Sequence, residues 1–391
     1  MIVLHLSLTP LIGAPLRICK ALRGRGIDAR CAVLSADIGD YARRTFDQDL
    51  QWANDRDEII DLARRCDVLH LHNFVDLEST QFAPIDIASL WKTGKPMLRH
   101  FHSTPQTIAR FMKTTPASVL ACPIPKLSIA QYPARFYRSA KLVPNIVLAD
   151  ELHRSLPARE GALRIAYAPT RFNSARSDRW DTKAYPETVK LLRKVVRDAR
   201  RRGIDVELDI IEFASHAECL ARKARCHVVI DDLATGSYHL NTLESLAAGS
   251  VCLTYMDHAT RVAMTEITGR ADFPALNVGL EDAAAVLREL LAEPSLVEGI
   301  GSDSRRWMQQ YWAPDRMVQH FIEAYEQVMS TPGQPFRDQQ RESSPAAQWQ
   351  EEQLQDIIWV NRSARWPKIM PEWMRRMRGL AGTSLRRIGL R

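Results

Sequence analysis

Small and polar side chains gather in the window 230–251 (IDDLATGSYHLNTLESLAAGSV), where a strand pattern changes to a helix pattern. The strand pattern ends at Ile230, a loop of small residues follows, and the helix pattern runs from near Leu240 to Ala248. Backbone can approach a ligand closely at such a loop, and the amides and dipole at the start of a helix attract phosphate. The window therefore predicts a nucleotide-diphosphate site at Gly236, Ser237, Tyr238, Leu240, Asn241 and Thr242.

Three acidic residues accompany this loop. Glu244 lies one turn into the expected helix, where its carboxylate could accept two hydrogen bonds from the hydroxyls of a ribose. Asp231 and Asp232 directly follow the strand and could either touch a ligand or cap the helix. The same pattern also fits an ordinary turn whose glutamate faces water, so the residue types alone leave both interpretations open.

The elements that must position these residues alternate between strand and helix. Strands are expected first at 2–7, 29–34, 67–72, 96–102 and 141–143, and then at 163–168, 206–211, 227–230 and 251–255. Helices are expected at 187–201, 217–224, 241–248 and 283–291 in the second series. This alternation predicts the α/β class, with two Rossmann-like, doubly wound parallel-sheet domains that face each other across a cleft.

The expected domains divide the chain into three parts. Residues 1–155 form the first domain and residues 156–330 the second, which helices at 305–311 and 314–329 are expected to close. Residues 331–391 form a linker, rich in Pro, Gln and Ser at its start, and a basic tail.

The segment LESLAAG at 243–249 resembles the donor-site helix of GT-B glycosyltransferases of the retaining group 1 (family 4) class. In that family two glutamates, with seven residues between them, flank a glycine-rich turn. The resemblance implies that Glu244 is the second, ribose-binding glutamate. The first glutamate, which contacts the donor sugar in the family, is replaced here by Gly236.

Further segments resemble the same family in the same order. MIVLHL with GAPLRICKALRGRG, at the start of the chain, implies that Gly13 lies where backbone approaches the donor phosphate or the acceptor. DVLHLHN at 67–73 and KPMLRHFHSTP at 95–105 resemble two strands of the first domain, and the resemblance makes His102 the partner of the donor sugar. LVPN at 142–145 resembles the strand before the interdomain crossing.

LRIAYAPTR at 163–171 resembles the first strand of the family's second domain, which supplies an arginine and a lysine to the diphosphate. Arg171 and Lys183 are the expected pair, with Arg176 and Arg179 as competitors because the loop is longer than usual.

The resemblance implies a hexosyltransferase-type enzyme that moves a sugar from a nucleotide-diphosphate sugar to a hydroxyl of a glycan, lipid-linked or protein acceptor. It further implies a retaining outcome and a role in surface polysaccharide or glycoconjugate assembly. Cations and helix amides would stabilise the leaving diphosphate, so no metal and no other cofactor is expected. His102 would orient the sugar or stabilise developing positive charge rather than act as a base.

Two alternatives remain beside this function. The absence of a glutamate at Gly236 favours a catalytically silent GT-B domain that binds a nucleotide sugar or a glycan. A nucleotide-sugar epimerase, also built on the GT-B architecture, fits the motifs less well.

The formal net charge of +7 lies mostly in the tail, where residues 360–391 carry nine basic side chains and one acidic one. A nearly neutral body argues against a basic groove, so no nucleic-acid partner is expected. An apolar stripe over 366–380 lies beside Arg375, Arg376 and Arg378. This tail, residues 366–391, predicts a peripheral contact with an anionic membrane, or docking on the body or on another subunit.

The start of the chain lacks a signal-peptide pattern, and no apolar run is long enough to span a membrane, so a cytoplasmic location is expected. The seven cysteines contain no CxxC pair and are expected to be reduced and mostly buried. His70 and His72, like His100 and His102, alternate on expected strands and could in principle bind zinc. No further cluster with metal spacing accompanies them in the sequence, so no metal site is expected.

Overall fold

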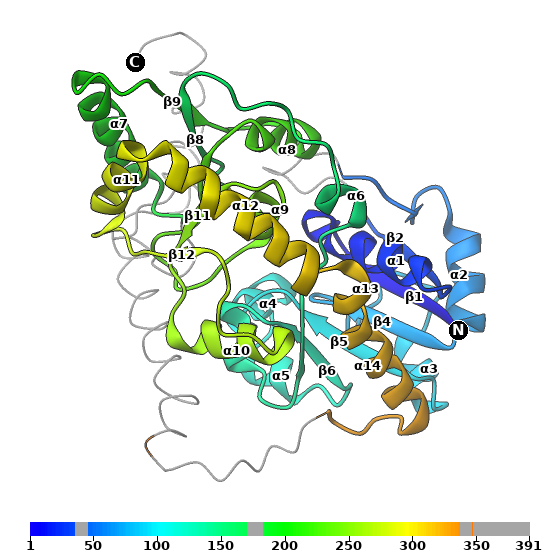
Figure 1. The fold of residues 1–391 in the computed structure, drawn as a ribbon. Coiled ribbons are helices and arrows are strands. Elements are labelled where there is room, and N and C mark those ends of the chain that lie inside the picture. The colour runs from blue at the N-terminus through cyan, green and yellow to red at the C-terminus, as the bar shows by residue number, and fades with distance from the viewer. Residues whose placement is uncertain (36–45, 170–182, 337–345, 347–391) are drawn as a thin grey trace, which may run out of the picture.

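The computed structural model describes residues 1–35, 46–169, 183–336 and 346. Within these ranges the chain forms two parallel β-sheets, one of seven strands and one of five, each flanked by helices (Figure 1). The fold class expected from the alternation of strands and helices is therefore confirmed.

The first sheet has the strand order β3-β2-β1-β4-β5-β6-β7, and all of its pairings are parallel. Its central strands are buried along their whole length, as expected for a parallel sheet covered on both faces. The register aligns His5 with His70 and His72 with His100. The strands are β1 (Ile2–Ser7), β2 (Asp28–Val33), β3 (Leu50–Gln51), β4 (Val68–His72), β5 (Met97–Phe101), β6 (Lys126–Ile129) and β7 (Lys141–Val143).

The helices of this half begin at local signals. Thr104 and Thr115 each cap a helix that has proline at its first position: the Thr104 hydroxyl accepts a hydrogen bond from Thr107 N, and the Thr115 hydroxyl accepts one from Ser118 N. The helices are α1 (Ala14–Gly24), α2 (Arg56–Arg65), α3 (Ile87–Lys92), α4 (Pro105–Met112), α5 (Pro116–Ala121) and α6 (Ala149–Leu152), with short 3-10 turns η1 (Leu11–Gly13) and η3 (Tyr132–Phe136).

The second sheet has the order β12-β11-β10-β8-β9 and is also parallel. Its strands are β8 (Leu163–Tyr167), β9 (Val206–Ile210), β10 (Val228–Ile230), β11 (Val251–Thr254) and β12 (Leu276–Asn277). Its helices are α7 (Tyr185–Arg201), α8 (His216–Ala224), α9 (Leu240–Ala247), α10 (His258–Thr268), α11 (Ala283–Ala292) and α12 (Pro294–Tyr311).

The helices α13 (Pro314–Met317) and α14 (Gln319–Ser330) return to the first half of the chain. The helix α14 packs against β4 and β7, and α13 packs against α1, whereas we expected both to close the second unit (Figure 1). At the crossing point Trp312 is fully buried and its indole nitrogen donates a hydrogen bond to Asn145 O at 2.9 Å. The apolar face of α14 thus covers the first sheet.

None of the helices in the described ranges is both long and apolar enough to cross a membrane.

Candidate functional site

A cavity of about 250 Å³ opens between the two sheets, at the ends where their strands finish. Residues just beyond β5, β8 and β9 line it, as do the start of α1 and the start of α9. The carboxyl ends of parallel strands are the usual place for a ligand in such folds. The cavity therefore brings His102 from the first half to face Lys183, His239, Leu240, Asn241 and Glu244 from the second.

Lys183 is held on the wall of this cavity by a buried carboxylate. Its Nζ lies 2.7 Å from Asp231 Oδ1 and 2.6 Å from His239 Nδ1. Burial alone would raise the pKa of Asp231, but Lys183 and His239 keep that pKa well below its ordinary value. Asp231 is thus a buried anion that fixes the lysine ammonium beside the cavity.

Asp231 also organises the start of α9. Its Oδ2 accepts hydrogen bonds from the backbone N of His239 at 3.0 Å and from the Thr242 hydroxyl at 2.6 Å. The neighbouring Asp232 instead accepts the backbone amides of Ala234 and Thr235, so it shapes the loop before the helix. The sequence left open whether these aspartates touch a ligand or cap the helix. In the structure both of them bond to the local backbone at the start of α9 and in the loop before it.

Glu244 lies at the centre of a second cluster, in which charged groups from both halves of the chain meet. Its Oε1 accepts hydrogen bonds from Arg17 Nη2 and from His216 Nε2, each at 2.9 Å, and its Oε2 accepts one from Lys223 at 2.5 Å. Arg17 also forms a bidentate pair with Glu151, at 2.6 and 2.7 Å. We call Arg17, Glu151, His216, Lys223 and Glu244 the ionic cluster.

The ionic cluster keeps Glu244 charged although it is buried. Burial by itself would raise the pKa of Glu244, but Lys223, His216 and Arg17 lower it far below its usual value. A carboxylate offers about four lone-pair sites, and three are already used here. The two ribose hydrogen bonds expected from the sequence therefore cannot both be added without displacing a neighbour.

Five of the predicted site residues line the cavity: His102, Lys183, Leu240, Asn241 and Glu244. Gly13 lies between two further lining residues, Ile12 and Ala14, and has a φ of +77° at the start of α1. A Cβ added to Gly13 would lie 3.2 Å from the ring of Phe46, so both conformation and space favour glycine there.

Four predicted residues have positions that differ from the expected ones. Tyr238 is fully buried in the core against Trp312, and the Thr242 hydroxyl is bonded to Asp231. The Ser237 hydroxyl accepts a hydrogen bond from Tyr132 N at 3.0 Å, which ties the loop to the first half. Gly236 has a φ of +86°, and an added Cβ would lie 2.9 Å from the Asp257 carboxylate. None of these four is among the residues found to line the cavity.

Three predicted cations, Arg171, Arg176 and Arg179, lie outside the described residues, as does the tail 366–391. Four further residues of the site were not predicted from the sequence: Arg17, His216, Lys223 and His239. Their roles depend on contacts between distant segments, such as Arg17 with Glu244, and no local pattern marks them.

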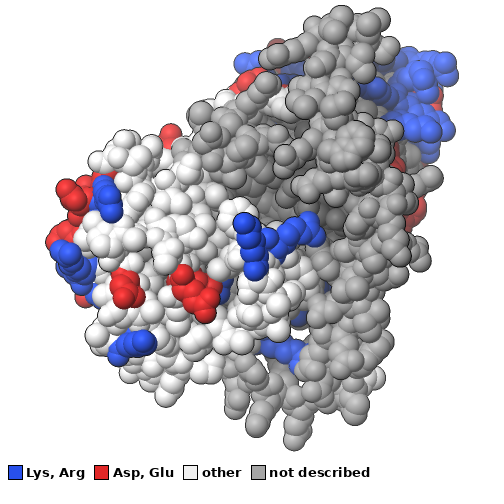
Figure 2. All heavy atoms as spheres, turned by 180° about the vertical axis from the view of Figure 1, so that it is seen from behind, with Lys and Arg blue, Asp and Glu red and all other residues white. Residues whose placement is uncertain are grey.

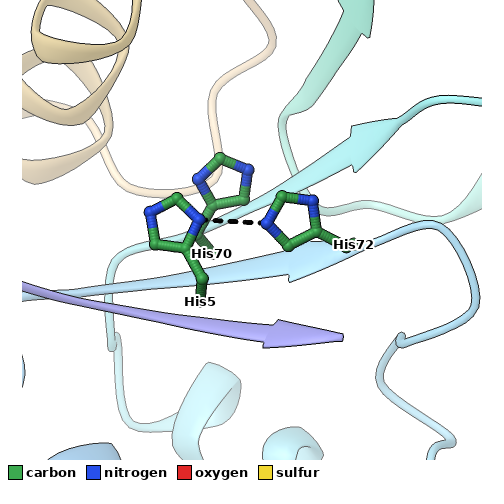
Figure 3. A group of neighbouring side chains, drawn as sticks. All are labelled: His5, His70 and His72. Atoms are coloured by element: carbon green, nitrogen blue, oxygen red, sulfur yellow. Dashed lines mark hydrogen bonds between the residues drawn. The ribbon is translucent and has the colours of Figure 1, made fainter. Parts of the chain in front are cut away.

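The first sheet carries five buried or half-buried histidines on β1, β4 and the end of β5, and Tyr325 of α14 joins them. His102 Nε2 lies 3.0 Å from His72 Nδ1. His72 Nε2 lies 3.0 Å from His5 Nδ1, the contact drawn in Figure 3. The Tyr325 hydroxyl bridges His5 Nε2 at 3.2 Å and His70 Nδ1 at 2.8 Å. We call His5, His70, His72, His100, His102 and Tyr325 the histidine cluster.

Burial keeps the histidine cluster neutral. It lowers the pKa of His5 and of His102 to about 3, and it lowers the pKa values of His70, His72 and His100 well below the ordinary range. The His100 ring packs against that of His102 at a tilt, with the centroids 4.0 Å apart, and neither of its ring nitrogens has a hydrogen-bond partner among the described residues.

Three groups of described side chains have the spacing of metal ligands, with one ligand atom each within 4.8 Å: His5 with His70 and His72, His72 with His100 and His102, and Glu151 with His216 and Glu244. In each histidine group two of the nitrogens already share a hydrogen bond of 3.0 Å. In the third group the Arg17 guanidinium bonds to both carboxylates and so supplies the positive charge.

No protein-family model matches the sequence, and no curated protein matches it in sequence. Solved structures do match in three dimensions. An α-glucosyltransferase in complex with UDP and a 13-mer DNA containing a central A:G mismatch has a TM-score of 0.60 at 11% identity, over 83% of this chain and 99% of that one. The fold is GT-B. An α-glucosyltransferase with UDP-glucose and DNA containing an abasic site matches this GT-B chain with a TM-score of 0.57 at 10% identity, over 83% and 99% of the two chains.

The expectation that no nucleic acid takes part is wrong, because the GT-B structures just named hold DNA together with UDP or UDP-glucose. The charges of the body are also unevenly distributed over its surface. Figure 2 shows basic side chains gathered at the upper right of the rear view, where α7 lies. The exposed cations of that helix are Lys190, Arg193, Lys194, Arg197, Arg200 and Arg201.

Proposed function

We propose that the protein is a glycosyltransferase that moves a sugar from a nucleotide-diphosphate sugar to an acceptor hydroxyl, within the cavity between its two sheets. The proposal rests on one observation: residues from the two halves of the chain line opposite walls of the same cavity. Lys183 and the start of α9 form one wall, and His102 faces them from the other. In this assignment the second half of the chain, from residue 156 to the end of α12, holds the donor. Residues 1–155, with α13 and α14 packed on them, hold the acceptor.

The diphosphate would lie against Lys183 and the start of α9. A lysine ammonium group has three N–H donors. Lys183 uses two of them, on Asp231 and His239, so the third can donate to a phosphate oxygen. The positive end of the α9 dipole adds to this attraction. Because these groups are already oriented, they can stabilise the negative charge that develops on the leaving diphosphate, and the proposal needs no metal.

The nucleoside would lie against the apolar wall formed after β9 by Ile211, Phe213 and Ala214. Such a wall suits the flat face of a base. Glu244 lines the same cavity with one lone-pair site of its carboxylate still open, which fits a single hydrogen bond from a ribose hydroxyl.

A retaining outcome, and a role in surface polysaccharide or glycoconjugate assembly, belong to the proposal through the resemblance of LESLAAG at 243–249. The acceptor would be a glycan, a lipid-linked group or a protein. A cytoplasmic location, with the tail at an anionic membrane surface, is part of the same proposal.

Nucleotide binding tests the proposal directly. Titration calorimetry with UDP, GDP and ADP is expected to show binding of at least one. The variant Lys183→Met combined with Asp231→Asn removes the ammonium without leaving a buried charge, and should weaken that binding roughly 10- to 100-fold, as for the loss of a charge-assisted hydrogen bond. Lys194→Met, an exposed lysine on α7, is the matched control and should bind normally.

Transfer assays with the corresponding sugar nucleotides complete the test. Turnover that persists in EDTA supports transfer without a metal. Binding without turnover would favour the silent GT-B domain, for which the glycine at Gly236 is the specific observation. If none of the three nucleotides binds, the glycosyltransferase proposal fails.

A further inference from the structure

The histidine cluster contains one continuous chain of hydrogen bonds that begins at the cavity. It runs from His102 through His72, His5 and Tyr325 to His70, with four hydrogen bonds between five groups. His102 lines the cavity at one end. At the other end His70 Nε2 is buried and has no partner among the described residues.

The protons of this chain can be counted. Burial keeps the four imidazoles neutral and raises the pKa of Tyr325 well above its ordinary value, so each of the five groups carries one exchangeable proton. Each of the four bonds uses one proton, so the fifth must lie at an end of the chain. It sits either on His102 Nδ1, at the cavity, or on His70 Nε2.

The chain therefore has only two arrangements that keep every bond. In one, all four histidines carry the proton on Nδ1, and in the other all four carry it on Nε2, because each bond fixes the next ring. A neutral histidine ring in water carries its proton mainly on Nε2, and this preference acts four times in the same direction. It favours the second arrangement, in which His102 Nε2 donates to His72 Nδ1.

We propose that Tyr325 is a positioning residue which, through His5 and His72, fixes the tautomer of His102, so that an unprotonated Nδ1 is presented at the cavity and accepts a hydrogen bond from a hydroxyl of the bound sugar. The part that concerns the sugar rests on the proposed function, whereas the part that concerns the tautomer does not. His102 Nε2 is already engaged with His72, so Nδ1 is its ring nitrogen left for a ligand.

This arrangement assigns His102 a definite chemistry. It selects a sugar hydroxyl that can donate a hydrogen bond, and it disfavours a donor sugar whose hydroxyl at that position is absent or methylated. The chain ends inside the protein at His70, so a proton taken up by His102 would have no outlet through it. The proposal therefore assigns His102 the role of holding the sugar.

Nitrogen NMR of the full-length protein without ligand, labelled with ¹⁵N in its histidines and measured at neutral pH, tests the tautomers. His5, His70, His72 and His102 are all expected to carry the proton on Nε2. Scalar coupling across the N–H···N bonds should connect His102 with His72, and His72 with His5. A mixture of tautomers among the four, a proton on His102 Nδ1, or no coupling between His72 and His102 would overturn the proposal.

Tyr325→Phe tests the coupling to α14. It removes the acceptor of the His5 Nε2 proton, so the remaining chain should populate both arrangements, and the two ring ¹⁵N signals of His102 should move towards each other. Tyr311→Phe, at the end of α12, is the control and should leave them unchanged. His102 signals that do not respond to Tyr325→Phe would contradict the positioning role. Zn²⁺ retained at one equivalent with loss of the couplings would also overturn it, in favour of a metal site.

A second measurement separates this inference from the proposed function. With UDP-glucose as the probe, Tyr325→Phe should raise KM about five-fold, the size expected for one weakened hydrogen bond, with kcat little changed. The affinity for UDP, which has no sugar, should stay the same. Equal weakening of UDP and UDP-glucose would contradict the role of Tyr325. If neither ligand binds, the same comparison is made with whichever of GDP and ADP binds and with its glucose derivative. The proposed function fails only if none of the three nucleotides binds, and the NMR result is judged separately.

Discussion

The histidine cluster and the ionic cluster solve the same problem in opposite ways. Both are buried beside the cavity, and both join segments far apart in the chain. The histidine cluster avoids charge, since burial lowers every one of its imidazole pKa values. The ionic cluster keeps its charges and pairs them, so the pKa of Glu244 falls instead of rising. Burial alone thus does not decide the charge of a group; its partners do.

The difference has a consequence for how each cluster tolerates loss of a member. Removing one ion from a paired set leaves its partners buried and uncompensated, whereas removing a neutral ring leaves at most an unpaired polar atom. The ionic cluster should therefore be the more fragile of the two at neutral pH, and the histidine cluster should be the more sensitive to acid.

Among the single substitutions the largest effect is expected for Glu244→Ala, which leaves Lys223 and Arg17 without their shared carboxylate. Loss of one partner from a buried ion pair costs about 3–5 kcal/mol of the free energy of unfolding. Urea denaturation at pH 7.5 measures it, with the exposed Glu289→Ala on α11 as control. A loss below about 1 kcal/mol would mean that the ionic cluster is already hydrated and that the comparison does not hold.

Acid is expected to act on the histidine cluster as a whole, with an effect that grows as the pH falls and as more of its histidines contribute. Because the folded pKa values lie below the unfolded value of 6.5, the unfolded chain takes up protons first as the pH falls. The free energy of unfolding should therefore fall from about pH 6.5 towards the folded pKa values, by up to about 1.4 kcal/mol per pH unit for each histidine. Between pH 4.5 and 6.5 Glu244 and Asp231 contribute little to this slope, since they stay ionised in the folded state and largely so in the unfolded one.

His100→Phe isolates the contribution of one histidine to the pH dependence of the free energy of unfolding. An aromatic ring stays at this position and no hydrogen bond is lost, but one buried titratable group is removed. Denaturation at several pH values should show a slope smaller by about one proton, and the variant should be more stable than the wild type at pH 5. An unchanged slope would show that His100 titrates normally in the folded protein.

The smallest effect is expected for Thr242→Val, which removes one hydrogen bond to Asp231 while Lys183 continues to neutralise it. The loss should be about 1 kcal/mol. Thr265→Val, an exposed threonine on α10, serves as the control. A loss as large as that of Glu244→Ala would show that Asp231 depends on its hydrogen bonds more than on its ion pair.

Local patterns predicted most of the elements because each strand and helix carries its own apolar period. Strands 2–7 and 141–143 were predicted with the observed bounds, whereas β6 (Lys126–Ile129) was missed because it is short and follows the irregular segment CPIP at 122–125. The return of α14 to the first sheet could not be predicted, since its apolar face is equally suited to either sheet.

The same limit applies to the site. The alternation of His70 and His72 was visible in the sequence, but the addition of His5 depends on the parallel register that aligns it with His70, and that of Tyr325 depends on where α14 packs. Tyr238 was assigned to the ligand by its place in a loop pattern, yet its ring packs into the core. A motif locates a loop, but tertiary packing decides which of its side chains face the ligand.

The return of α14 also bears on how the protein can be divided. A fragment ending at residue 155 would expose the surface that Phe321, Ala324, Tyr325 and Val328 now shield from water. The helices that cover this surface, α13 and α14, begin some 160 residues later along the chain. The amino-terminal half should thus become fully protected during synthesis only once the ribosome has nearly finished the other half, and co-expressing residues 314–330 as a separate peptide would be the way to rescue the isolated fragment.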